Sequence, residues 1–278
     1  RDHPPQDTSF VTRTSKWTNS VREMKKYVNA MYPQGGGDGP EAVTAALDEV
    51  NKLCYRKGSA RVCVLIADAP PHGIEPPTSH DGFPDGPPSG LDALDIVRKM
   101  ADNSIVIYAV GVEPNLGHYT YARDFMSAIA KMTDGKFLPL TSASLLPGVI
   151  IGGSAEEIAL NKIEDTAEEK IEQIMAKNKG ISQEECLKKL TIELQKSGVQ
   201  TKQLHLDDIY GSYDNTNVNR ICEAKKLTRI HTNLKKGLNA HVADEVSKHT
   251  SHRGYLRADG PSAPSSTYGG RYGSSGYG

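Results

Sequence analysis

The stretch RVCVLIADAPPHG, residues 61–73, decides the fold of this chain. Its first part, residues 61–67, contains an apolar run without polar alternation, which is typical of a strand buried on both faces of a parallel sheet. Asp68 follows directly, and two prolines and a glycine then prevent a strand or a helix from continuing. Because parallel sheets bind ligands where their strands end, Asp68 is expected at a candidate site.

Helical and strand patterns alternate around this stretch. Helices are predicted over 21–31, 40–53, 91–100 and 121–132, and further strands over 10–17, 105–112 and 136–140. The alternation predicts an α/β fold for residues 1–151, with a Rossmann-like, doubly wound and mostly parallel sheet in which strand 61–67 is central.

The character of the sequence changes after this region. Residues 152–253 predict a helical extension, with one helix starting at a capping box at Ser154 and a second starting at Ser182. These helices are expected to pack on the domain or on each other, and helix 156–177 offers an alternative role in self-association as a short coiled coil. Gly, Ser and Tyr dominate residues 254–278, which we expect to be a disordered tail.

The overall composition excludes several classes of partner. The 33 basic and 34 acidic residues nearly cancel, so no global field favours nucleic acid or an anionic membrane. No apolar run reaches the roughly 18 residues of a membrane helix, and no membrane span is predicted. The four cysteines form no metal-binding pair, which favours a reducing, cytoplasmic setting. Residues 1–5 are no signal peptide, and we expect the true N-terminus to lie upstream of Arg1.

Acidic residues in three loops are expected to meet at one edge of the sheet. Asp38 lies in a glycine-rich loop, Asp68 ends a strand, and Asp81 and Asp85 lie in the loop 70–90. Mg²⁺ prefers oxygen ligands and keeps several waters, so carboxylates at a strand edge suit it. Asp38, Asp68 and either Asp81 or Asp85 are therefore candidates for such a site, and Asp81 and Asp85 are also candidates for a binding loop.

Glycines and histidines complete the candidate loops. Gly37 and Gly39 flank the acidic residue of the glycine-rich loop and allow a sharp turn there. His72 follows the strand-ending aspartate and is a further candidate of the binding loop. His3, His72 and His80 do not show the spacing of a zinc site, and a loop-structuring role is favoured for them.

Four blocks of sequence stand out together: GGGDGPEAV (35–43), VLIADAPPHG (64–73), DGFPDGPPSG (81–90) and YAVGVEP (108–114). In combination they resemble a von Willebrand factor A domain, of the branch found beside alpha-type protein kinases. The resemblance covers about residues 1–151. It implies a protein-interaction domain with a metal-ion-dependent adhesion site that takes its ligands from three loops.

The resemblance assigns these three loops unequally. It implies that Asp68 is the ligand of the third loop, and that Asp38 takes the place of the threonine usual in the second. The Asp-x-Ser-x-Ser of the first loop is absent, because Asp7-Thr8-Ser9 is followed by Phe10 and Val11. The resemblance therefore implies that the first strand lies upstream of Arg1, and that strand 61–67 exposes an edge without it.

The function expected from this reading is non-catalytic. The resemblance implies that Mg²⁺ or another divalent cation keeps an open position, which an acidic side chain of a protein ligand completes. The alternatives are an adaptor or targeting region of an alpha-kinase-type protein and a metal-free scaffold. No nucleophile, dinucleotide-binding or Walker-type motif is present, so no enzymatic activity is expected.

Overall fold

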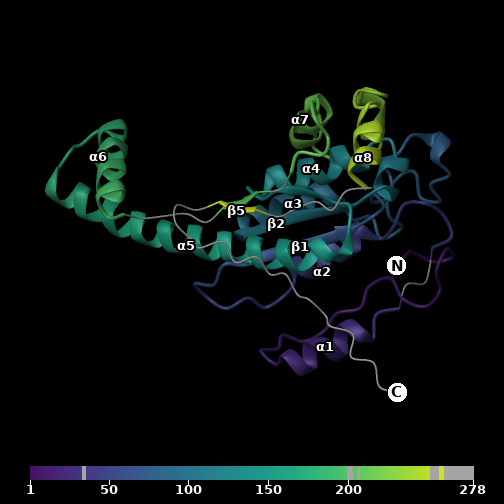
Figure 1. Cartoon of the computed structure of the whole chain (residues 1–278), viewed down its shortest axis with the longest axis horizontal. Helices are drawn as coiled ribbons and strands as arrows, with labels where there is room; N and C mark the ends of the chain where they lie inside the picture. The colour runs from purple at the N-terminus through teal and green to yellow at the C-terminus, as the bar shows by residue number, and fades with distance from the viewer. Residues whose placement is uncertain (33–35, 199–202, 206, 251–256, 260–278) are drawn as a thin grey trace, which may run out of the picture.

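The computed structural model describes residues 1–32, 36–198, 203–205, 207–250 and 257–259, and it is an α/β structure (Figure 1). Its main sheet has three parallel strands in the order β1-β2-β3. These strands are β1 (Arg61–Ala67), β2 (Ile105–Val112) and β3 (Phe137–Leu140). All three end at the same edge of the sheet, as the parallel pairing requires.

Helices surround this sheet. They are α1 (Val21–Asn29), α2 (Val43–Asn51), α3 (Ala93–Asp102), α4 (Ala122–Met132), α5 (Leu146–Lys177), α6 (Gln183–Lys196), α7 (Thr216–Glu223) and α8 (Val242–Thr250). Short 3₁₀ turns cover Pro77–Ser79, Asn115–His118, Ala143–Leu145 and Ile230–Asn233. A separate antiparallel pair consists of β4 (Gln203–His205) and β5 (Arg257–Asp259).

The predicted strands of the sheet and the helices between them are confirmed, with one exception. The strand predicted over 10–17 is wrong, because those residues form no strand and belong to neither described sheet. Their β-forming residues have no neighbouring strand to pair with, and β propensity depends on such a context.

β2, rather than β1, is the central strand of the described sheet. β2 is buried along almost its whole length, as expected. In β1 only Cys63 is buried, and Ile66 is 44% exposed, so burial of β1 on both faces was a wrong prediction. The reason is positional, since β1 pairs with β2 alone in the part of the sheet that the structure describes.

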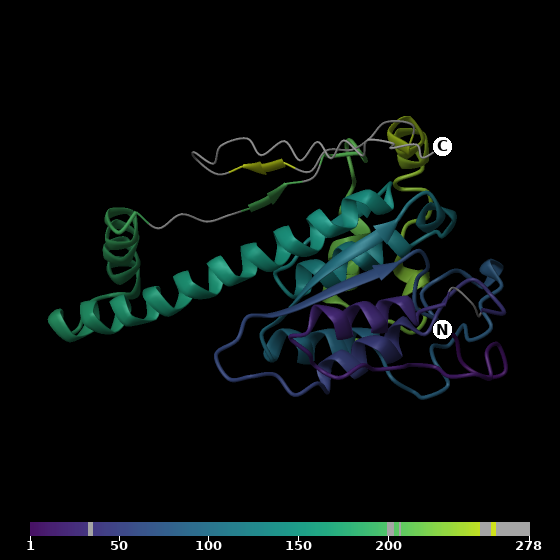
Figure 2. The same cartoon turned by 60° about the horizontal axis from the view of Figure 1, so that its bottom comes forward.

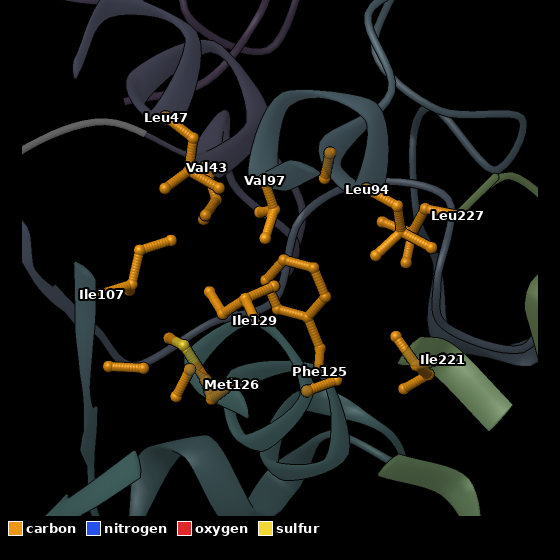
Figure 3. Packing of buried hydrophobic residues seen from close by; sticks show 14 of the residues in the cluster. Val43, Leu47, Leu94, Val97, Ile107, Phe125, Met126, Ile129, Ile221 and Leu227 are labelled. Atoms are coloured by element: carbon orange, nitrogen blue, oxygen red, sulfur yellow. The ribbon is translucent and has the colours of Figure 1, made fainter. Parts of the chain in front are cut away.

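Apolar side chains cover both faces of the sheet. Ile105, Ile107 and Ala109 of β2 belong to the larger core with α2, α3 and α4. Figure 3 shows Phe125 of α4 in the middle of this core. The alternate residues of β2 face a smaller cluster, in which Val149 of α5 is buried. The sheet is therefore a middle layer between helices.

α5 is anchored on β2 by buried carboxylates. The helix begins at Leu146, so the predicted start at Ser154 is wrong. Glu156 and Glu157, which were expected to complete the capping box, instead accept hydrogen bonds from the Tyr108 hydroxyl at 3.0 and 2.8 Å. The two glutamates therefore hold α5 on the sheet and do not cap the start of a helix.

By length and composition alone, the helical stretch Ala143–Lys177 could cross a membrane, which is weak evidence for a membrane span. The search of the sequence for a continuous apolar run did not predict it. The first part of this stretch packs on the sheet, and its second part projects beyond the sheet, as Figure 2 shows. There Ile174 packs with Cys186 and Leu190 of α6. The two helices thus pack on each other, as one of the expected arrangements had it, and self-association through 156–177 stays a prediction.

Residues beyond α6 return to the main core. Val218 and Ile221 of α7 are buried in the same cluster as Phe125, and Leu227 and Ile230 join them. The expected boundary between residues 151 and 152 falls inside α5. Of the expected tail 254–278, β5 is described and pairs with β4, and the remainder lies outside the described residues.

This packing predicts the effect of shortening one side chain of α7. Ile221 has no exposed surface, so Ile221→Ala should lower the free energy of unfolding by about 2–5 kcal/mol through lost burial and a new cavity. Ile192 on α6 is 49% exposed, and Ile192→Ala should change it by no more than about 0.5 kcal/mol. Urea unfolding followed by circular dichroism measures both. An equal change in the free energy of unfolding for both variants would show that α7 does not pack in the core.

Candidate functional site

Three chain segments lie side by side beyond the carboxyl end of β1. The backbone N–H of Ala42 donates to the carbonyl of Arg1 at 3.2 Å, and the N–H of Glu41 donates to the carbonyl of Pro70 at 2.9 Å. Glu41 also forms a parallel β-bridge with Pro71. The start of the chain, the loop before α2 and the loop after β1 are therefore held together by backbone hydrogen bonds.

His72 is the centre of this assembly. Its Nδ1 lies 2.7 Å from Asp81 Oδ1, and its Nε2 lies 2.7 Å from Asp2 Oδ1, with all three side chains at most 1% exposed. The Asp81 carboxylate also accepts from the backbone N–H groups of Gly73 and Phe83, both at 2.8 Å. Because Asp81 acts as an acceptor throughout, Nδ1 is the imidazole nitrogen that carries a proton toward it.

Asp38 brings a second carboxylate to the same place. Its Oδ2 accepts a hydrogen bond from the backbone N–H of Gly82. Among the described residues, Asp2, Asp38 and His72 can each offer one metal-ligand atom, and these atoms lie within 4.8 Å of one another. Asp2 Oδ2 and Asp38 Oδ1 are buried and find no hydrogen-bond partner in the described part of the chain.

Burial, hydrogen bonds and neighbouring charges shift the pKa values of the residues at this site in opposite directions. Burial raises the pKa of Asp38, and both the charge of Asp2 and a proton shared with its carboxylate add to that rise, while the Gly82 N–H and His72 act against it. Burial lowers the pKa of His72, but the hydrogen bonds to Asp81 and Asp2 outweigh burial and the net pKa is raised. The site therefore favours additional positive charge, which a proton or a cation can supply.

Two of the predicted acidic residues lie outside this group. Asp68 is exposed at the end of β1, and its Oδ2 accepts a hydrogen bond from Asn115 Nδ2 at 3.3 Å. Asp85 accepts from Arg229 Nε at 2.6 Å, with both side chains largely exposed. The structure thus brings Asp38 to His72 and Asp2 rather than to Asp68.

The candidate glycines shape the loop and offer no side-chain ligand. A Cβ on Gly37 would lie 2.3 Å from Gln6 Oε1, which is closer than real contacts allow. A Cβ on Gly39 would lie 3.0 Å from Cε1 of Tyr119, whose hydroxyl donates to the Gly39 carbonyl at 2.7 Å. Both glycines therefore allow close packing of the loop that carries Asp38.

Sequence reasoning did not identify Asp2 or Glu75. Asp2 reaches His72 across 70 positions of sequence, so no local pattern reveals the pair. Glu75 accepts from the backbone N–H groups of Thr120 and Tyr121, each at 2.8 Å, at the start of α4.

Comparisons with known proteins find two distant relatives. The chain is 34% identical over 95 residues, 34% of its length, to the alpha-protein kinase vwkA of Dictyostelium discoideum. It is 26% identical over 142 residues, 49% of its length, to a putative ariadne-like RING finger protein, R811, of Acanthamoeba polyphaga mimivirus. These matches span 15% and 13% of the two relatives. No family model matches the chain, and no solved structure matches it significantly.

Removing one carboxylate charge tests the electrostatics of the site. Because the pKa of Asp38 is raised in the folded state, its contribution to stability is fully present below its unfolded pKa and is lost as pH rises through the folded value. At neutral pH without metal, Asp38→Asn should therefore raise the free energy of unfolding, and the gain should shrink as pH falls toward 4, near the unfolded pKa of about 3.9.

Urea unfolding in a chelating buffer, repeated across this pH range, measures the effect. Asp68→Asn is the matched control, since Asp68 is exposed, and should change stability by no more than about 0.5 kcal/mol. A loss of stability in Asp38→Asn at neutral pH would contradict the account.

Proposed function

We propose that this chain carries a non-catalytic protein-interaction module of the von Willebrand factor A type. Its contact surface is the loop edge that contains Asp38, Asp68 and the residues around His72. A divalent cation held at this edge keeps one position open, and an acidic side chain of a protein ligand completes its coordination.

One observation carries this proposal. Carboxylate oxygens of Asp2, Asp38 and Glu41 are buried at this edge without a hydrogen-bond partner among the described residues. Burial raises the pKa of Glu41, and the nearby charges of Asp2 and Asp68 raise it further. Unpaired buried carboxylates are costly, and a bound cation is a common way to satisfy them.

The comparisons support a module separate from catalysis. One relative is named as an alpha-protein kinase and the other as a RING finger protein, and each is matched over a minor part of its length. A match confined to a minor part of each relative agrees with a binding domain that is carried beside other domains. The four cysteines are free, which agrees with the proposed cytoplasmic setting.

The second candidate is an adaptor or targeting region of an alpha-kinase-type protein. The observation that favours it is the similarity to the alpha-protein kinase vwkA. It makes the same loop edge a docking surface that acts in cis beside a kinase domain. A metal-free scaffold is the third reading, in which Asp38 and Asp68 only shape loops.

Peptide selection tests the leading proposal. We expect a random peptide library, selected on the chain in a mixture of Mg²⁺, Mn²⁺ and Zn²⁺, to yield sequences rich in Asp and Glu that EDTA releases. Asp38→Asn should lose these peptides by at least about tenfold in affinity, because it removes a charged contact to the cation.

Asp85→Asn is the matched control, because Asp85 lies in the same loop region but pairs with Arg229 at the surface. It should bind the selected peptides as the unmodified chain does. Peptides that bind equally well in EDTA would remove the cation from the mechanism and favour the scaffold.

A further inference from the structure

We propose that Asp2, Asp38 and His72 form a binding site for a divalent transition metal of the zinc type. The inference rests on the proposed function, because it names the ion and the ligands of the same loop edge. The resemblance of the sequence implied Mg²⁺ and the ligands Asp38 and Asp68, and the inferred site differs from that expectation in both respects.

The ligand set is already assembled. One atom from each of the three side chains lies within 4.8 Å of the others. Zinc–oxygen and zinc–nitrogen bonds are about 2.0–2.2 Å long, so ligands of one ion lie up to about 4 Å apart. A small rotation of one carboxylate therefore brings all three atoms to a single ion.

Unsatisfied oxygens point to a ligand that is not protein. Asp2 has no exposed surface, and its Oδ2 has no hydrogen-bond partner among the residues that the structure describes. The same holds for the buried Oδ1 of Asp38. Leaving a charged acceptor unpaired in the interior is destabilising, and a cation between the two carboxylates would satisfy both of these oxygens.

Asp81 gives His72 the orientation of a metal ligand. Metal-binding histidines commonly donate their second ring nitrogen to a carboxylate, which fixes the tautomer. Here Nδ1 donates to Asp81 Oδ1 at 2.7 Å, and two backbone N–H groups hold that carboxylate in place. The remaining nitrogen, Nε2, lies 2.7 Å from Asp2 Oδ1, and a bound ion would replace the proton of this contact.

The donor types select the class of metal. Mg²⁺ is bound through oxygen and keeps most of its waters, whereas an imidazole nitrogen suits zinc and similar ions. Two carboxylates also neutralise the charge of a divalent ion in a largely buried setting. Three protein ligands leave the fourth zinc position open, as in sites that bind a further group.

Partial exposure places that open position on the Asp38 side. Asp2 and His72 are buried, whereas Asp38 is only partly buried and Gly82 beside it is exposed. An acidic side chain from a protein ligand can therefore approach past Asp38. The site and the proposed contact surface are thus one continuous region.

Calorimetric titration with zinc alone tests the site on the whole chain. We expect one equivalent of Zn²⁺ to bind, and a large excess of Mg²⁺ to leave this binding unchanged. Asp38→Asn and Asp81→Asn should each weaken zinc binding by about tenfold or more, the first as a ligand and the second through the orientation of His72. Asp85→Asn, which alters an exposed ion pair, should bind zinc as the unmodified chain does.

Loss of folding does not obscure the result, because Asp38→Asn is expected to be the more stable protein without metal. Unchanged zinc affinity in Asp38→Asn, or competition by Mg²⁺ at equal concentration, would overturn the inference. Peptide capture that persists with Mg²⁺ while zinc does not bind would leave the proposed function standing. Zinc binding without any cation-dependent peptide capture would instead remove the proposed function and keep the site.

Discussion

The hydrogen bonds of His72 to Asp2 and Asp81 are the constraint on which the loop edge of this protein depends. One imidazole joins the start of the chain to the loop that follows β1, and both of its nitrogens lie 2.7 Å from a carboxylate oxygen. Each side chain is buried, so the charges are not screened by water. Loss of the imidazole would leave the buried carboxylates of Asp2 and Asp81 without this hydrogen-bond partner.

The sheet gives this cluster its position. β2 lies between β1 and β3, and all three strands end at the edge where His72 is found. α4 is tied to the same edge, because Glu75 accepts from two backbone N–H groups at its start. A carboxylate there also suits the positive end of the helix dipole. The polar edge is thus built on a rigid apolar core, which suits a binding surface.

The sequence predicted the parts of this structure that depend on local patterns. The apolar runs of β1 and β2 and the faces of α3 and α4 were recognised because each is periodic or continuous. The burial of β1 was overestimated, because its position at the edge of the described sheet is not written in its own residues. The start of α5 was misplaced, because Glu156 and Glu157 look like a cap but bind Tyr108.

The sequence predicted some residues of the candidate site and missed others. Asp38 and His72 were recognised as loop candidates, because glycines and prolines marked their loops. Asp68 was expected at the site because it follows the apolar strand, yet it lies exposed beside Asn115. Asp2 could not be found from sequence, because its pairing with His72 is made only by the tertiary fold.

The central claim is that Asp2, Asp38 and His72 together hold one cation. X-ray diffraction from crystals soaked in zinc, recorded on both sides of the zinc absorption edge, tests this claim most directly. A cation held by these residues should give one strong anomalous peak at about 2.0–2.2 Å from a carboxylate oxygen of each aspartate and from His72 Nε2. A difference map without a peak among these three side chains, in crystals that bind zinc elsewhere, would contradict it.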